Sequence, residues 1–130
     1  MIKEFIEKWY LNKEATRAYF ATAHPEAYID IVKQVIIAIA NDEYESPDPE
    51  RIHLIDIDDG DYQGTLLFII AAKYYQPDVY WYVKVDYGSC SGCDTLEAIR
   101  GYDDDPPTEE QLDDYMTLAL HIVQDLKRID

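Results

Sequence analysis

The chain has few basic residues, few cysteines and no long apolar segment. Its 130 residues include 11 lysines and arginines against 27 aspartates and glutamates, and only two cysteines. Two cysteines cannot build the disulfide framework of a small secreted domain. The longest apolar runs, 35–40 and 66–72, fall far short of the roughly 20 residues that span a membrane. Glu4 and Glu7 stand where a signal peptide would be apolar, so we expect a cytoplasmic protein with no membrane partner.

The motifs of several enzyme classes are also missing. The sequence contains no G-x-x-x-x-G-K phosphate loop and no G-x-S-x-G nucleophile elbow. It also lacks a cysteine that is followed by five residues and an arginine. The glycine loop 88–92 carries no lysine or arginine that would meet a phosphate. The sequence therefore names no reaction.

The negative charge limits the partners that the sequence predicts. A formal net charge of −16 would repel nucleic-acid phosphates and anionic lipids, so we expect no direct contact with either. Acids concentrate in residues 41–61 and 94–114, and each stretch holds a single arginine. Hydrophobic residues still make up 48% of the chain, which suffices for a core and predicts one folded domain over residues 1–130.

The spacing of apolar residues predicts an α+β fold. Residues 2–10 and 28–39 repeat apolar side chains every three or four positions, which is typical of helices, and 15–20 either extend the first helix or form another. Residues 52–57, 65–73 and 79–86 predict strands, whereas the two prolines in 46–49 predict a loop. Capping residues at Asp94 and Thr108 open two further helices. We expect a three-stranded antiparallel meander with two N-terminal and two C-terminal helices, the helices packed on one face of the sheet.

Cys90 and Cys93 form a C-x-x-C pair between a strand and the start of a helix. This spacing resembles a redox dithiol, although the neighbouring acids disfavour the thiolate that such chemistry needs. The pair also supplies two of the four ligands that a zinc site requires; we expect no cofactor, with zinc at this pair as the alternative. A third interpretation is two small residues packed in a tight glycine loop, with or without a reversible disulfide. The other candidate zinc ligands are His24, His53, His121 and a carboxylate.

Four aspartates, Asp56, Asp58, Asp59 and Asp61, surround a glycine in the order D-x-D-D-G-D. Such dense carboxylates are typical of Mg²⁺ or Ca²⁺ ligands. The glycine and glutamate positions of an EF-hand loop are not met, so that motif is absent. Two interpretations remain: a two-metal site completed by acids from distant elements, and a polar hairpin turn whose acids face water.

The strand predicted over 79–86 places Tyr80 and Tyr82 on the face opposite its apolar residues. The chain holds 12 tyrosines, an unusual number for its length. An exposed tyrosine face beside acids is typical of a protein-docking surface. Alternatively, helices cover both faces of the sheet and the tyrosines lie at the edge of the core.

Three segments resemble proteins of a known origin. Residues 60–65 (GDYQGT), 86–96 (DYGSCSGCDTL) and 114–121 (DYMTLALH) are similar to segments of small acidic proteins of tailed bacteriophages. The resemblance covers about half of the chain and implies a phage origin, but no reaction. Small acidic phage proteins often inhibit host enzymes or defence systems that handle nucleic acid. The resemblance therefore implies such a role in the host cytosol.

The sequence thus predicts a non-enzymatic, phage-encoded inhibitor that docks on a basic surface of a host protein. Its carboxylates would replace phosphates, because a basic groove responds first to negative charge and its spacing. One alternative is a metal- or thiol-dependent enzyme centred on Cys90 and Cys93, and another is a homo-oligomeric component of a virion. The predicted partner-binding residues are Asp56, Asp58, Asp59, Asp61, Tyr80, Tyr82, Asp103, Asp104, Asp105, Glu109 and Glu110.

Overall fold

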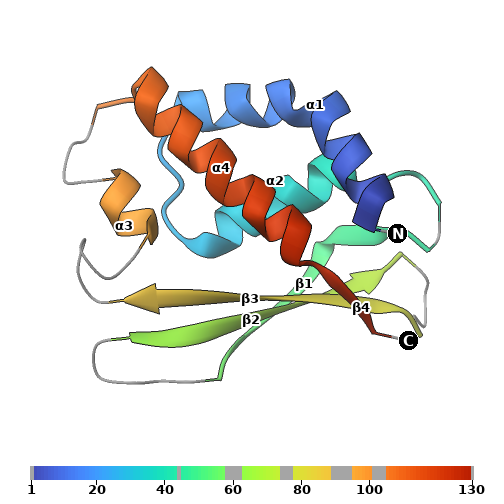
Figure 1. Cartoon of the computed structure of the whole chain (residues 1–130). Coiled ribbons are helices and arrows are strands. Elements are labelled where there is room, and N and C mark those ends of the chain that lie inside the picture. Colours follow the sequence, from blue (N-terminus) through green and yellow to red (C-terminus); the bar gives the residue numbers. More distant parts are fainter. Residues whose placement is uncertain are drawn as a thin grey trace.

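Helices pack on one face of an antiparallel sheet. The computed structural model describes residues 2–43, 45–57, 63–73, 78–88, 95–100 and 105–129. The strands lie in the order β1-β2-β3-β4, and the described helices cover a single face of the sheet (Figure 1). The α+β class is therefore confirmed, whereas the predicted number of strands is one too few. The elements are α1 (Ile2–Thr22), α2 (Tyr28–Ile39), β1 (Pro47–Asp56), β2 (Gln63–Ala72), β3 (Tyr80–Gly88), α3 (Thr95–Arg100), α4 (Glu109–Asp125) and β4 (Lys127–Ile129).

α1 is the longest helix, with 21 residues, and it lies against α2 and α4. Residues 15–20 continue this helix rather than forming another. The helix is held along its length, because Trp9 and Phe20 are both buried in the core. It ends at Thr22, shortly before Pro25, which disfavours helical geometry in the residue that precedes it. No described helix, α1 included, has the combined length and apolar character that crossing a bilayer demands.

α2 lies between α1 and the sheet (Figure 1), and it contacts α1, α4 and β1. The Asp30 carboxylate accepts hydrogen bonds from the backbone N–H groups of Glu26 and Ala27, at 3.0 and 3.1 Å. These bonds satisfy donors at the start of the helix, where the helix dipole also favours a carboxylate. Ile37 is 49% exposed, so burial does not extend as far around the helix as its sequence predicts. The buried residues are Tyr28, Ile31, Val32, Val35, Ile36, Ala38 and Ile39.

The central strands β2 and β3 supply the sheet side of the core. Phe68 pairs with Val83, and Ile70 pairs with Trp81. These four side chains face the helices and are at most 2% exposed. Lys84, the next residue along β3, is exposed on the opposite face. The two-residue alternation predicted for this strand is therefore confirmed, and it divides the sheet into a buried and an uncovered face.

Two segments differ from the expectation based on sequence. β1 begins at Pro47, so residues 47–49 belong to a strand rather than a loop. β1 is an edge strand, where a proline need not remove an inter-strand hydrogen bond, and its register shifts between Pro47 and Ile52. The last helix ends at Asp125, and β4 pairs with Tyr80–Tyr82 of β3. Leu126 has an extended backbone and is 4% exposed, so the chain leaves the helix there and reaches the sheet.

Candidate functional site

Five exposed carboxylates gather where the chain enters α4. We call them the acidic end: Asp105, Glu109, Glu110, Asp113 and Asp114. Glu109 and Glu110 occupy the first turn of the helix, where the dipole stabilises a carboxylate by about 0.3–1 kcal/mol. Asp113 and Asp114 follow one turn later. The acidic end can therefore present several carboxylate oxygens to a cationic partner.

Thr108 and Gln111 fix the start of α4 and with it the acidic end. The Thr108 hydroxyl accepts a hydrogen bond from the Gln111 backbone N–H at 3.2 Å, and the Gln111 side-chain carbonyl accepts one from the Thr108 N–H at 2.9 Å. This reciprocal arrangement is a capping box, which satisfies two donors that a helix start leaves unpaired. The Gln111 amide also donates to the Ile99 carbonyl at 3.0 Å, which ties α3 to the same place.

Arg17 of α1 fastens the acidic end to the neighbouring helix. One guanidinium nitrogen lies 2.7 Å from Glu109 Oε2, and another lies 2.7 Å from Asp113 Oδ1. The two carboxylates are one helical turn apart, so a single planar guanidinium reaches both. The hydrogen bonds to Glu109 and then to Asp113 raise the pKa of Arg17 above its usual value. Within the described residues, Arg17 is the one cation in contact with the acidic end.

His24 connects the acidic end to the core. Its Nδ1 lies 2.6 Å from the hydroxyl of Tyr115, and its Nε2 lies 2.9 Å from the backbone carbonyl of Asp105. The Tyr115 ring is fully buried and packs against Phe20. The segment that leads into α4 is thus held by a side chain from the loop after α1. The sequence left His24 open as a zinc ligand or as a hydrogen-bonded residue, and it did not identify these two partners.

Glu110 and Asp114 are the exposed pair that Arg17 does not reach. They lie one turn apart on α4, and neither side chain forms an ion pair or hydrogen bond with another described residue. Like charges at this spacing destabilise a helix by a few tenths of a kcal/mol. Sequence reasoning did not select Asp113 or Asp114, although their four-residue spacing from Glu109 and Glu110 on a helix is a readable signal.

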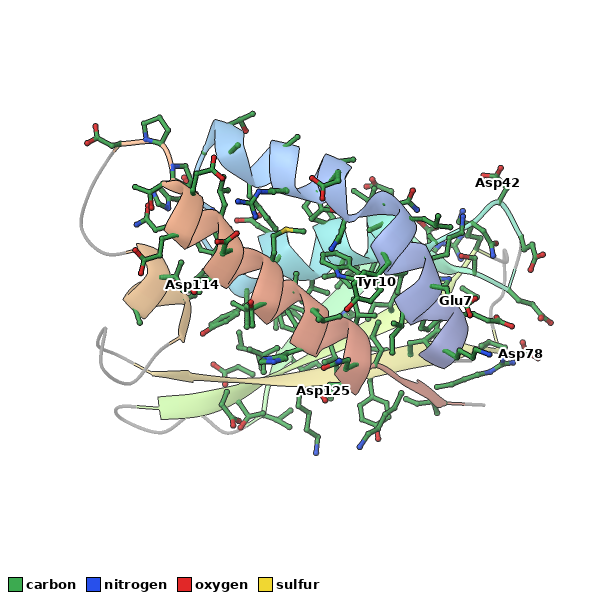
Figure 2. The ribbon with its side chains drawn as sticks, turned by 45° about the horizontal axis from the view of Figure 1, so that its top comes forward. Glu7, Tyr10, Asp42, Asp78, Asp114 and Asp125 are labelled. Carbon is green, nitrogen blue, oxygen red and sulfur yellow. The ribbon has the colours of Figure 1, made fainter. Side chains whose placement is uncertain are left out.

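The described carboxylates do not form one continuous face. Asp114 lies at one end, and Asp42 and Asp78 lie at the other (Figure 2). Elsewhere, Glu50 of β1 pairs with Lys33 of α2 at 3.7 Å. The acidic end holds five exposed carboxylates within ten consecutive residues, four of them on the first two turns of one helix.

The structure also separates the predicted partner-binding residues. Asp105, Glu109 and Glu110 lie together in the acidic end, whereas Tyr80 and Tyr82 pair with β4, beyond the other end of α4. The 17 residues of α4 make it about 25 Å long. Asp56 lies apart from both groups, at the end of β1. The predicted residues that lie outside the described part of the chain are Asp58, Asp59, Asp61, Cys90, Cys93, Asp103 and Asp104.

The sheet face turned away from the helices forms a second candidate surface, which we call the outer face. Its centre consists of Ile55, Leu67, Ile69, Tyr80 and Tyr82, which the strand register places on one side. Ile55 is 36% exposed, and the other four are half-buried. No described helix covers these side chains (Figure 1). Of the two arrangements that the sequence leaves open for the tyrosines, the described structure therefore has the uncovered one.

Lysines flank one side of the outer face. Lys127 lies opposite Tyr82, and Lys84 lies opposite Leu67 in the register. A shallow hollow of about 190 Å³ opens between Tyr82, Lys84, Asp125 and Lys127. Two lysines against one carboxylate, Asp125, leave this hollow with a small local excess of positive charge, in contrast with the acidic end of the same helix.

The histidines proposed as zinc ligands lie on different elements of the structure. His24 bonds to Tyr115, His53 lies in the edge strand β1 and His121 is exposed on α4. Among the described residues, no three histidine, cysteine or acidic side chains come together as metal ligands.

Comparisons of the chain with protein-family models, curated proteins and solved structures give no match. The case for function therefore rests on the two surfaces themselves.

Proposed function

We propose that this protein is a non-enzymatic, phage-encoded inhibitor whose acidic end docks on the basic surface of a host protein that handles nucleic acid. The observation that carries the proposal is the acidic end itself, with its five exposed carboxylates and one described cation in contact with them. The phage origin is carried only by the resemblance of residues 60–65, 86–96 and 114–121, and it stays part of the proposal.

The arrangement of the acidic end supports binding to a cationic groove. Its carboxylates repeat along the first turns of a helix that the capping box, Arg17 and His24 hold in place. A held array loses less side-chain freedom when a partner binds than a mobile tail does. Glu110 and Asp114 keep their charges free of described cations, so they can pair with lysines or arginines of a partner.

A host protein is first captured by the chain from host cytosol at low salt and is then purified. The test measures the affinity of that protein for the chain. We expect its affinity to fall steeply with salt and duplex DNA to compete for the same partner. The double charge reversal Glu110→Lys with Asp114→Lys is expected to weaken binding by at least about tenfold, because two contacts become repulsive. Asp42→Lys with Glu43→Lys is the matched control, because it changes the net charge equally at the opposite end.

Three results would contradict the proposal. They are equal weakening by the two double variants, equal affinity at low and high salt, and binding that duplex DNA does not affect.

The alternative of a metal- or thiol-dependent enzyme centred on Cys90 and Cys93 is tested separately, by native mass spectrometry with and without a chelator. A stoichiometric zinc, lost together with an activity in Cys93→Ser, would favour that alternative.

A further inference from the structure

The outer face leaves a wide apolar area uncovered. Ile57 and Ile129 are 48% and 43% exposed and continue the apolar centre at its margins. Backbone pairing extends to Ile57, whose N–H donates to the Thr65 carbonyl at 3.0 Å. Contiguous apolar area of this kind marks an interaction surface more often than a face that water alone covers.

Acids are nearly absent from this face, although the chain as a whole is strongly acidic. The chain has 27 acids among 130 residues, but among the described residues that the register turns outward in β2, β3 and β4, only Asp86 is acidic. Its carboxylate already accepts a hydrogen bond from the Thr65 hydroxyl at 3.1 Å. A sheet face that only contacts water normally carries polar and charged residues. In a chain with this excess of acids, most of those charged residues would be aspartate or glutamate. The face instead combines an apolar centre with two flanking lysines, Lys84 and Lys127.

We propose that the outer face binds an amphipathic helix of a partner protein, with an apolar stripe on the sheet and carboxylates beside Lys84 and Lys127. Strand spacings make the face about 20 Å long and about 14 Å wide. A helix of about 13 residues has that length and width. The bound helix would complete a three-layer arrangement, with the sheet between two helical layers.

Charge and shape favour this occupant over two others. A second copy stacked on the face would bring the same two lysines against Lys84 and Lys127, and its Asp86 carboxylate already accepts a hydrogen bond from Thr65. A single-stranded nucleic acid needs aromatic rings for its bases to stack on, whereas the most exposed apolar side chains of this face are the aliphatic Ile55, Ile57 and Ile129. The carboxylates of the bound partner helix interact mainly with Lys84 and Lys127, because at physiological salt the repulsion from more distant acids of this chain is screened beyond about 8 Å.

The probes are two synthetic peptides of about 14 residues that share one leucine and alanine stripe. One carries glutamate along both sides of the stripe, and the other carries lysine. Titration of the full chain by fluorescence anisotropy at physiological salt is expected to show the glutamate peptide binding about tenfold tighter, although the chain carries −16 charges. Lys84→Glu with Lys127→Glu is expected to reverse that preference.

A matched pair of variants tests the apolar contact. Ile57→Asn is expected to weaken the glutamate peptide about fivefold, whereas Ile37→Asn on α2 leaves it unchanged. Both side chains are close to half exposed, so both variants should fold. In the peptide titration, the proposal is overturned if both peptides bind equally, if the lysine peptide binds more tightly or if neither binds at millimolar concentration. It is also overturned if Ile57→Asn and Ile37→Asn change the affinity of the glutamate peptide equally. A dimer that Ile57→Asn dissociates, or a single-stranded oligonucleotide that outcompetes both peptides, would overturn it in favour of those occupants. None of these variants alters the acidic end, so this inference and the proposed function fail separately.

Discussion

His24 holds the acidic end against the core through two hydrogen bonds. The Asp105 carbonyl can only accept, so the proton of the neutral imidazole is on Nε2. Nδ1 then accepts from the Tyr115 hydroxyl at 2.6 Å. Replacing either residue therefore breaks a defined bond, and replacing both tests whether the two act on each other.

The expected energies follow from this geometry. A neutral hydrogen bond contributes about 1 kcal/mol to stability. The edge-on contact of the two rings, with centroids 5.8 Å apart, adds about 0.5 kcal/mol. His24→Ala should therefore lower the free energy of unfolding by about 2.5 kcal/mol and Tyr115→Phe by about 1 kcal/mol. The double variant should lose about 2.5 kcal/mol rather than the sum, which gives a coupling energy of about 1 kcal/mol.

Urea unfolding followed by tryptophan fluorescence measures these values, because Trp9 and Trp81 are both buried in the folded state. The three variants are compared with the unaltered chain, and the dependence on urea should keep the same slope. Additivity within about 0.3 kcal/mol would refute the hydrogen bond between His24 and Tyr115 as a stabilising contact. A lost coupling with an unchanged slope would mean that Tyr115 does not anchor His24, and with it the Asp105 carbonyl, to the core.

Two further substitutions test the cap and the core. Thr108→Ala should lower the free energy of unfolding by about 1 kcal/mol, because it removes the hydroxyl that accepts a hydrogen bond from the Gln111 N–H. Circular dichroism during urea unfolding measures this change. A loss under about 0.3 kcal/mol would contradict the stabilising role of the cap. Phe68→Ala, at a fully buried position, should cost about 3–5 kcal/mol, whereas Leu54→Ala, at 44% exposure, should cost under about 1 kcal/mol in the same assay; similar losses would contradict the difference in burial between these two cross-strand partners.

Local patterns predicted the elements whose own residues determine them. β3 was predictable because its side chains alternate between the core and the opposite face, and α2 because its apolar residues repeat at helical spacing. The strand at residues 47–49 was missed because proline is excluded only from central strands, and sequence does not show which strand is at an edge. β4 was missed because three residues show no periodicity, and lysine and arginine there also suit the end of a helix.

The candidate site was predictable as a composition but not as an arrangement. The excess of acids in residues 94–114 indicated an acidic surface, and the structure places part of that stretch at the start of α4. The contacts of Arg17 with Glu109 and Asp113 join positions 92 and 96 residues apart, and no local pattern encodes such a pairing. The uncovered outer face likewise depends on which side of the sheet the helices pack against, which side-chain alternation alone does not determine.

α4 explains how one small chain presents two surfaces of opposite local charge. Its first turns carry the acidic end, and beyond its last turn β4 adds Lys127 to the outer face. The helix is about 25 Å long, roughly three times the distance over which physiological salt screens a charge, so the lysines are little affected by the carboxylates at the far end. Buried Leu112, Tyr115 and Ile122 fix α4 against the core, so neither surface needs the helix to move in order to bind. A basic partner and an acidic helix can therefore occupy the same molecule, each recognised by charges that the other does not contact.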